Sequence, residues 1–184
     1  MSTAPQLDTP PSDLRTLEDA ANAVEERLQR ALEHVRSAVA AEGAGPGDPL
    51  DRHQLALYDL AFTRAELSAA RALLAHARAA EGRGHEALAR GLAGLFVAET
   101  VANLRQRIGS RAVDYGMTRE GLDAPFTGLL DGVLQAAGGT AALEAIGAAL
   151  VEAEGDLGPV DLPEDKRMMA DTFRRFADDV VAPR

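Results

Sequence analysis

The fold class of this chain is set by residues 12–41, which read SDLRTLEDAANAVEERLQRALEHVRSAVAA. Apolar side chains recur there at spacings of three and four residues: Leu14, Leu17, Ala21, Val24, Leu28, Ala31 and Val35. Because an α-helix turns once in 3.6 residues, this spacing places all of them on one face, with Arg and Glu opposite. Ser12 is the expected N-cap, since its hydroxyl can accept a hydrogen bond from a free backbone N–H. The stretch therefore predicts an amphipathic helix that packs in a bundle.

The same period continues downstream and predicts helices over residues 51–80, 85–111 and 126–137, with another that Thr140 caps. The apolar face expected of the helix over 51–80 comprises Leu55, Tyr58, Phe62, Leu67, Ala70 and Leu74. The inward face expected over 85–111 comprises Leu88, Leu92, Leu95, Phe96 and Leu104. No stretch alternates apolar and polar residues with β-branched enrichment, so no strand is expected. The sequence predicts an all-α fold, an antiparallel bundle of about five helices plus a terminal helix.

Glycine and proline mark the boundaries between these elements. Residues 1–11 are polar and proline-rich, which is typical of a disordered leader. Residues 43–49 (GAGPGDP) and 82–84 (GRG) each end a predicted helix. Residues 155–163 are rich in Gly, Pro and Asp and form the expected linker. The predicted organisation is a leader over 1–11, a helical domain over 12–154, a linker over 155–163 and a last helix over 164–184.

The composition excludes several classes of function. Among 184 residues, 29 are acidic and 19 basic, which gives a formal net charge of −10. This charge opposes binding to nucleic acid or to anionic membranes, because both are polyanions. Cysteine is absent, so disulfides, thiolate metal sites and cysteine nucleophiles are excluded. The first residues lack the basic and apolar regions of a signal peptide. No apolar run approaches the ~20 residues that a membrane span requires. The cytoplasm is therefore the expected compartment.

The histidines do not form a metal-ligand pattern. None of the four has a second histidine three or four residues away, which would place both on one helix face. They are His34, His53, His76 and His85. His85 is followed by Glu86, as in a His-Glu-x-x-His zinc motif, but the second histidine is missing. We therefore expect solvated surface histidines and no metal site.

The carboxylates likewise do not predict an acid–base pair. Glu25 and Glu26 are adjacent, as are Asp178 and Asp179, and neighbouring helical residues point about 100° apart. Glu99 lies in an apolar stretch and is expected to be partly buried. A structural partner such as Arg explains a carboxylate there better than catalysis does. No catalytic residue is assigned.

Motifs for nucleophiles and phosphates are also missing. The chain has no Gly-x-Ser-x-Gly and no Gly-x-x-x-x-Gly-Lys. Gly138, Gly139 and Thr140 stand at a helix start, where free N–H groups could bind an anion. A turn followed by a helix cap explains the same residues, and it is the commoner arrangement.

The segment over residues 164–184 carries the main indication of function. Its apolar side chains follow helical spacing and a proline ends the pattern: Met168, Met169, Thr172, Phe173, Phe176, Val180, Val181 and Pro183. The run Phe173-Arg174-Arg175-Phe176-Ala177-x-x-Val180-x-x-Pro183 resembles the first helix of the acyl-CoA dehydrogenases. In that family this helix begins an α-helical domain, which a β-domain and a C-terminal four-helix bundle follow.

The organisation of the rest of the chain is similar to one subgroup of that family. Proteins of the (2S)-methylsuccinyl-CoA dehydrogenase type carry a long helical extension before this first helix. Here the order is also helices, a Gly-Asp-Leu-Gly linker at 155–158, a Leu-Pro-Glu turn at 162–164, and the terminal helix. Residues 53–74 with the following Ala-rich helix resemble two helices of the family's C-terminal bundle, although any Ala/Leu helical hairpin would share these features.

The resemblance implies an FAD-dependent oxidoreductase that oxidises the α,β bond of an acyl-CoA, of the branched methylsuccinyl type, and passes electrons to an electron-transfer flavoprotein. It also implies a homo-oligomer in which this stretch packs on the remainder of the dehydrogenase chain. No residue here matches the family's flavin-binding or catalytic positions, so this stretch alone is expected to be inactive. The alternative is a non-enzymatic helical module that binds a partner protein. A free module should dock its last helix on its own bundle, whereas an enzyme's first helix should leave Phe173, Phe176 and Val180 uncovered.

Overall fold

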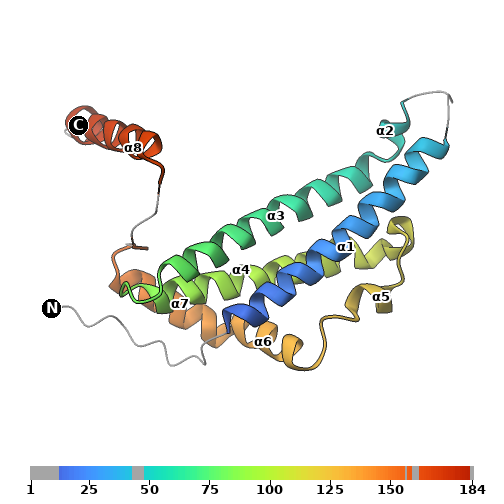
Figure 1. Ribbon diagram of the computed structural model, residues 1–184, viewed down its shortest axis with the longest axis horizontal. Coiled ribbons are helices and arrows are strands. Elements are labelled where there is room, and N and C mark those ends of the chain that lie inside the picture. Colours follow the sequence, from blue (N-terminus) through green and yellow to red (C-terminus); the bar gives the residue numbers. More distant parts are fainter. Residues whose placement is uncertain (1–12, 43–47, 156, 159–161, 183–184) are drawn as a thin grey trace.

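The computed structural model describes residues 13–42, 48–155, 157–158 and 162–182, and these form helices without any strand (Figure 1). The leader expected over 1–11 and the predicted cap at Ser12 lie outside these residues. Helix α1, Leu14–Ala41, is capped instead by Asp13, whose carboxylate accepts a hydrogen bond from the backbone N–H of Arg15 at 3.2 Å. The predicted apolar face of α1 is buried as expected.

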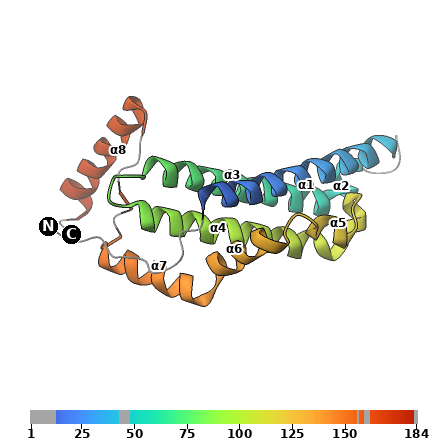
Figure 2. The ribbon, with the colours of Figure 1, turned by 60° about the horizontal axis from the view of Figure 1, so that its bottom comes forward.

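The helix predicted over 51–80 is divided in two. A single turn, α2 (Pro49–Arg52), is followed by α3 (Gln54–Ala79), and His53 between them leaves the helical conformation with φ −101° and ψ 11°. The predicted helix over 85–111 also ends early. Helix α4 is Glu86–Arg107, and a 3₁₀ segment, η1 (Gly109–Tyr115), follows with a kink at Arg111. The antiparallel packing of α1, α3 and α4 is confirmed (Figures 1 and 2).

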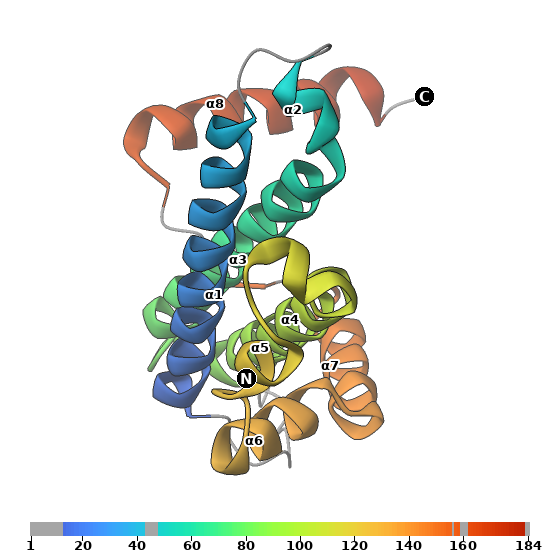
Figure 3. The same ribbon diagram turned by 90° about the vertical axis from the view of Figure 1, so that its right-hand side faces the viewer.

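Helix α4 is the central element of the bundle. It packs against α1 and α3 on one side, and against α6 (Gly128–Gly138) and α7 (Thr140–Glu152) on the other (Figure 3). By length and composition alone α4 could cross a membrane, but half of its apolar window is buried inside the bundle. Its composition is therefore that of a core helix, and the predicted all-α bundle is confirmed.

The connections around α6 and α7 differ in detail from the sequence prediction. Helix α5, Arg119–Asp123, occupies part of the stretch before α6. The N-cap of α7 is Gly139 in an extended conformation, and Thr140 makes no capping hydrogen bond, so the predicted cap was wrong. Helices α6 and α7 meet at a bend of 47° and follow the surface of α4.

The predicted apolar face of α3 is only half correct. Its C-terminal part is buried, at Leu67, Ala70 and Leu74. Its N-terminal part is exposed, because Leu55, Tyr58 and Phe62 are 59%, 57% and 44% accessible. The buried positions there are Asp59, Leu60 and Thr63. Asp59 takes part there in a buried ion pair, which is described below.

Candidate functional site

The terminal helix forms as the sequence predicts. Helix α8 is Glu164–Phe176 and continues as one π-helical turn, η2 (Ala177–Val181). Glu164 and Asp165 lie in its first turn, where negative charge complements the helix dipole. Arg167 donates a hydrogen bond to the carbonyl of Leu162 at 3.1 Å, which fixes the turn that enters the helix. The helix is thus held by local contacts.

No residue of α8 or η2 is buried. The exposed fractions are 69% for Phe173, 58% for Phe176 and 45% for Val180. Met169, four residues before Phe173, lies on the same face and is exposed, and so is Met168 beside it. The ribbon shows α8 standing apart from the bundle, beyond the end of α3 (Figures 1 and 2). Large apolar side chains aligned on one face mark an interaction surface, so this apolar face of α8 is the candidate site.

The apolar face of α8 has no partner among the described residues. A free module was expected to cover these side chains with its own helices, and the described bundle does not cover them. Most charged residues of α8 lie on its other side, where Arg174 pairs with Asp171 at 3.5 Å, whereas Asp165 and Lys166 of the first turn lie nearer the apolar side. The helix therefore offers an apolar stripe with a charged back, which is the form of a helix that packs on another polypeptide.

The histidines are only partly solvated, in contrast to the prediction. His34 is exposed, but His53, His76 and His85 are half-buried. Nε2 of His53 lies 2.7 Å from a carboxylate oxygen of Glu42. The histidines remain separate from one another, and within the described ranges no group of three His, Asp or Glu side chains could hold a metal ion.

The predicted carboxylate positions serve structure. Glu25 binds Arg64 at 2.6 Å and Arg71 at 3.2 Å, and so joins α1 to α3. Burial opposes the ionisation of Glu25, but hydrogen bonds from Gln29 and Arg64 and the charge of Arg71 outweigh it and lower its pKa. Glu99 is exposed and not partly buried as expected, because α4 turns this position away from its neighbours. Asp178 and Asp179 are exposed on η2.

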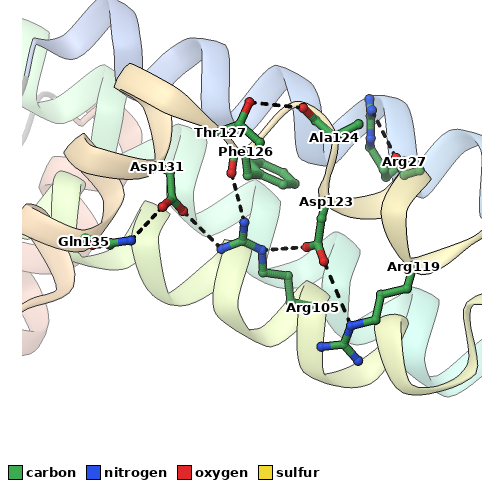
Figure 4. A network of polar contacts seen from close by, with 10 residues as sticks. Arg27, Arg105, Arg119, Asp123, Ala124, Phe126, Thr127, Asp131 and Gln135 are labelled. Carbon is green, nitrogen blue, oxygen red and sulfur yellow. Dashed lines mark hydrogen bonds and ion pairs between the residues drawn. The ribbon is translucent and has the colours of Figure 1, made fainter.

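Arg105 organises the largest polar network that the sequence did not indicate (Figure 4). From α4 it binds Asp123 at 2.8 Å, and its guanidinium lies 3.6 Å from Asp131 of α6. It also donates to the carbonyl of Phe126 at 3.1 Å and covers the ring of that residue, 5.2 Å from the centroid. The guanidinium of Arg105 thus makes its contacts with groups inside the bundle. We therefore interpret the network as one that fixes the chain between α5 and α6, and not as a binding site.

A second network is buried between α3 and η1. Asp59, which is 6% exposed, accepts hydrogen bonds from Arg111 and from the hydroxyl of Tyr115, the latter at 2.7 Å. Burial of Tyr115 and its hydrogen bond to Asp59 raise the pKa of the phenol. The Asp59 carboxylate is paired with both Arg111 and Tyr115, and it lines none of the three grooves described below. We therefore interpret this network as a structural ion pair. Sequence reasoning missed it because Asp59 lies more than 50 residues before Arg111 and Tyr115 in the chain.

Grooves on the surface of the described bundle were compared with the needs of a flavin. Three shallow grooves of about 290, 300 and 310 Å³ lie on its surface, at the lower limit of ligand pockets. The second and third are lined by charged side chains already paired with each other, such as Glu18 with Arg78 and Arg105 with Asp131. The first is lined mainly by apolar residues of α1, α2 and α3. None combines the size and polar groups that a dinucleotide requires, so no residue here is assigned to FAD.

Comparison with protein-family models, with curated proteins and with solved structures gives no significant match. The functional inference therefore depends on the residues of α8 and on their placement.

Proposed function

We propose that this chain is the N-terminal helical part of an FAD-dependent acyl-CoA dehydrogenase that oxidises the α,β bond of a methylsuccinyl-type acyl-CoA. In this proposal α8 is the first helix of the catalytic body, and the bundle before it is an extension. FAD, the catalytic base and the contacts with an electron-transfer flavoprotein belong to the catalytic body. The role of the described residues is packing and not chemistry.

The observation that carries the proposal is the uncovered apolar face of α8. The residues Phe173, Phe176 and Val180 that produce the resemblance to the family's first helix are the same residues that the bundle leaves exposed. A buried Phe contributes about 1.5–3 kcal/mol relative to an exposed one, so leaving two of them in water is unfavourable unless another surface covers them. A catalytic body that receives this helix supplies that surface.

The test uses two polypeptides. The 184-residue chain, purified and mixed with FAD, should stay colourless and should not oxidise methylsuccinyl-CoA in the presence of an artificial electron acceptor. The polypeptide encoded by the complete reading frame should purify with bound FAD and catalyse this oxidation. A yellow, active 184-residue chain would contradict the proposal, as would a complete reading frame whose product binds no flavin.

A further inference from the structure

Helix α8 carries both of the exposed methionines among the described residues. Met168 and Met169 are 66% and 53% accessible. Met169 lies one turn before Phe173 on the apolar face, and Met168 lies beside it. The remaining described methionine, Met117, is partly buried and packs against the core of the bundle. The methionines of the described chain thus divide into an exposed pair on α8 and one sheltered side chain elsewhere.

The thioethers of α8 are open to oxidation by a hydroperoxide such as hydrogen peroxide. The sulfur attacks one peroxide oxygen, so that an S–O bond forms while the O–O bond breaks and the sulfur loses two electrons. The hydroxide that leaves takes the proton of the transferred hydroxyl group and becomes water, and methionine sulfoxide remains. Cysteine is absent from the sequence, so no thiol of this chain competes for the oxidant. Exposure therefore decides which side chains react first.

Oxidation would change the character of the apolar face. A sulfoxide is polar, whereas the thioether that it replaces is apolar. The residues that follow Met169 along the stripe, Phe173 and Phe176, offer no hydrogen-bond donor to the new oxygen. The hydroxyl of Thr172 already donates to the backbone carbonyl of Met168 at 2.8 Å. Burial of the sulfoxide oxygen against an apolar partner without a donor is unfavourable, so an oxidised face favours water over packing.

We propose that Met168 and Met169 form an oxidation site that controls the docking of α8: a hydroperoxide converts them to sulfoxides, the face becomes polar, and the helix no longer packs on its partner. Methionine sulfoxide reductases, which act on the two sulfoxide epimers, reverse the change. The control of docking rests on the proposed function, because it acts on the surface through which α8 meets the catalytic body. The oxidation site itself belongs to the 184-residue chain and is tested without that body.

Oxidation rates in the 184-residue chain test the site. The chain is treated with hydrogen peroxide, and peptide mass spectrometry follows each methionine with time. We expect Met168 and Met169 to react at least ~5-fold faster than Met117, because their sulfur atoms are the more accessible to the oxidant. Equal rates at the three positions would overturn the proposal.

Retention on a hydrophobic-interaction column measures the change in surface. The oxidised parent chain should elute earlier than the untreated chain, and treatment with both types of sulfoxide reductase should restore its retention. The matched control is the double variant Met168→Leu/Met169→Leu, because leucine is similar in volume and cannot form a sulfoxide. Its retention should change far less on oxidation, and a change as large as that of the parent chain would contradict the site.

Two variants of the complete reading frame test the control of docking. Met169→Gln imitates the polarity of the sulfoxide and Met169→Leu keeps the face apolar, while both residues are good helix formers. Cleavage by trypsin after Arg174 and Arg175 reports how firmly α8 is held, because cleavage requires local opening of the chain. We expect Met169→Leu to be cleaved as slowly as the complete parent protein, and Met169→Gln at least ~10-fold faster.

The other outcomes separate the two proposals. If the complete protein is a flavoprotein and both variants are cleaved at the same rate, slow or fast, polarity at Met169 does not control docking, and the switch is overturned while the proposed function stands. If the complete protein binds no flavin, the proposed function is overturned and the control of its docking with it. The oxidation rates in the 184-residue chain then still decide whether Met168 and Met169 are the reactive site.

Discussion

Replacing Phe173 and Phe176 together by alanine should leave the free energy of unfolding of the 184-residue chain nearly unchanged. Both rings are exposed, at 69% and 58%, and α8 has no buried residue. Exposed substitutions away from special features usually change stability by less than about 0.5 kcal/mol each. Alanine is also the better helix former, so α8 itself should not melt. This prediction tests the observation on which the proposed function depends.

Phe126→Ala is the matched control, because it removes the same ring from a buried place. Phe126 is 2% exposed and lies under the guanidinium of Arg105. Buried Phe→Ala substitutions cost about 3–5 kcal/mol, which includes the cavity that remains. For a chain of this length each kcal/mol lowers the melting temperature by about 2–4 °C. The control should therefore melt at least about 6 °C below the parent protein, and the double variant within about 2 °C of it.

The measurement is unfolding by heat and by urea, followed by far-ultraviolet circular dichroism. The urea slope must agree between parent and variants, so that the midpoints report stability and not a change in the surface exposed. A loss of more than about 2 kcal/mol in the double variant would show that the bundle buries α8. The apolar face would then be covered within this chain, and the support for a missing partner would disappear.

Three further predictions concern the bundle. Gly116 has φ +66°, and a β-carbon there would lie 2.5 Å from Nδ1 of His34. Gly116→Ala should therefore lower the free energy of unfolding by about 1–2 kcal/mol in a urea titration, mainly because alanine disfavours the left-handed backbone, and an unchanged stability would contradict this geometry. The pKa of Glu25 is lower in the folded protein than its ordinary value of 4.5, so ionised Glu25 stabilises the fold above pH 4.5, and this contribution is lost as the pH falls through the folded-state pKa. Glu25→Gln should therefore cost about 0.5–1 kcal/mol at pH 7, and this cost should shrink below pH 4.5. The pKa of Tyr115 is raised in the folded protein, which favours the neutral phenol, so the free energy of unfolding should fall as the pH rises above the ordinary value of 10.0. Tyr115→Phe should be about 1–3 kcal/mol less stable at pH 7, because Asp59 loses a hydrogen-bond donor. This variant should also lack the part of the alkaline fall that is due to the phenol. Chemical denaturation at several pH values checks both.

The sequence predicts helices well where one apolar face decides the packing. Residues 12–41 have a single face with the correct period, and α1 buries it as expected. The limits of elements were predicted less well where a local backbone feature intervenes. No glycine or proline stands beside His53 to mark the break there. Gly109 lies two residues before the kink at Arg111, but Gly91 and Gly94 stay inside α4, so a glycine alone does not place the end of this helix.

The orientation of α3 could not be predicted, because this helix has two candidate faces. Leu67, Ala70 and Leu74 continue in the direction of Thr63 and Leu60, whereas Leu55, Tyr58 and Phe62 form a different stripe. The sequence predicts the more apolar stripe as the core face at the N-terminal end. The structure buries the other, because Asp59 binds Arg111 and Tyr115 there, and no pattern in the sequence shows that these distant residues meet.

The error about α3 has a physical meaning that bears on function. A soluble helix with two apolar faces has a packing partner for each, since an apolar seam in water gains nothing and promotes aggregation. The bundle buries one face of α3 and pairs the charged residues of this helix with α1 and α4. On the exposed side, the guanidinium of Arg107 lies over the ring of Phe62, 5.6 Å from its centroid. Helix α8 shows the same condition in simpler form, with one apolar face and no buried residue. Under the proposed function, the exposed apolar face of α8 is the surface through which the bundle contacts the rest of the protein.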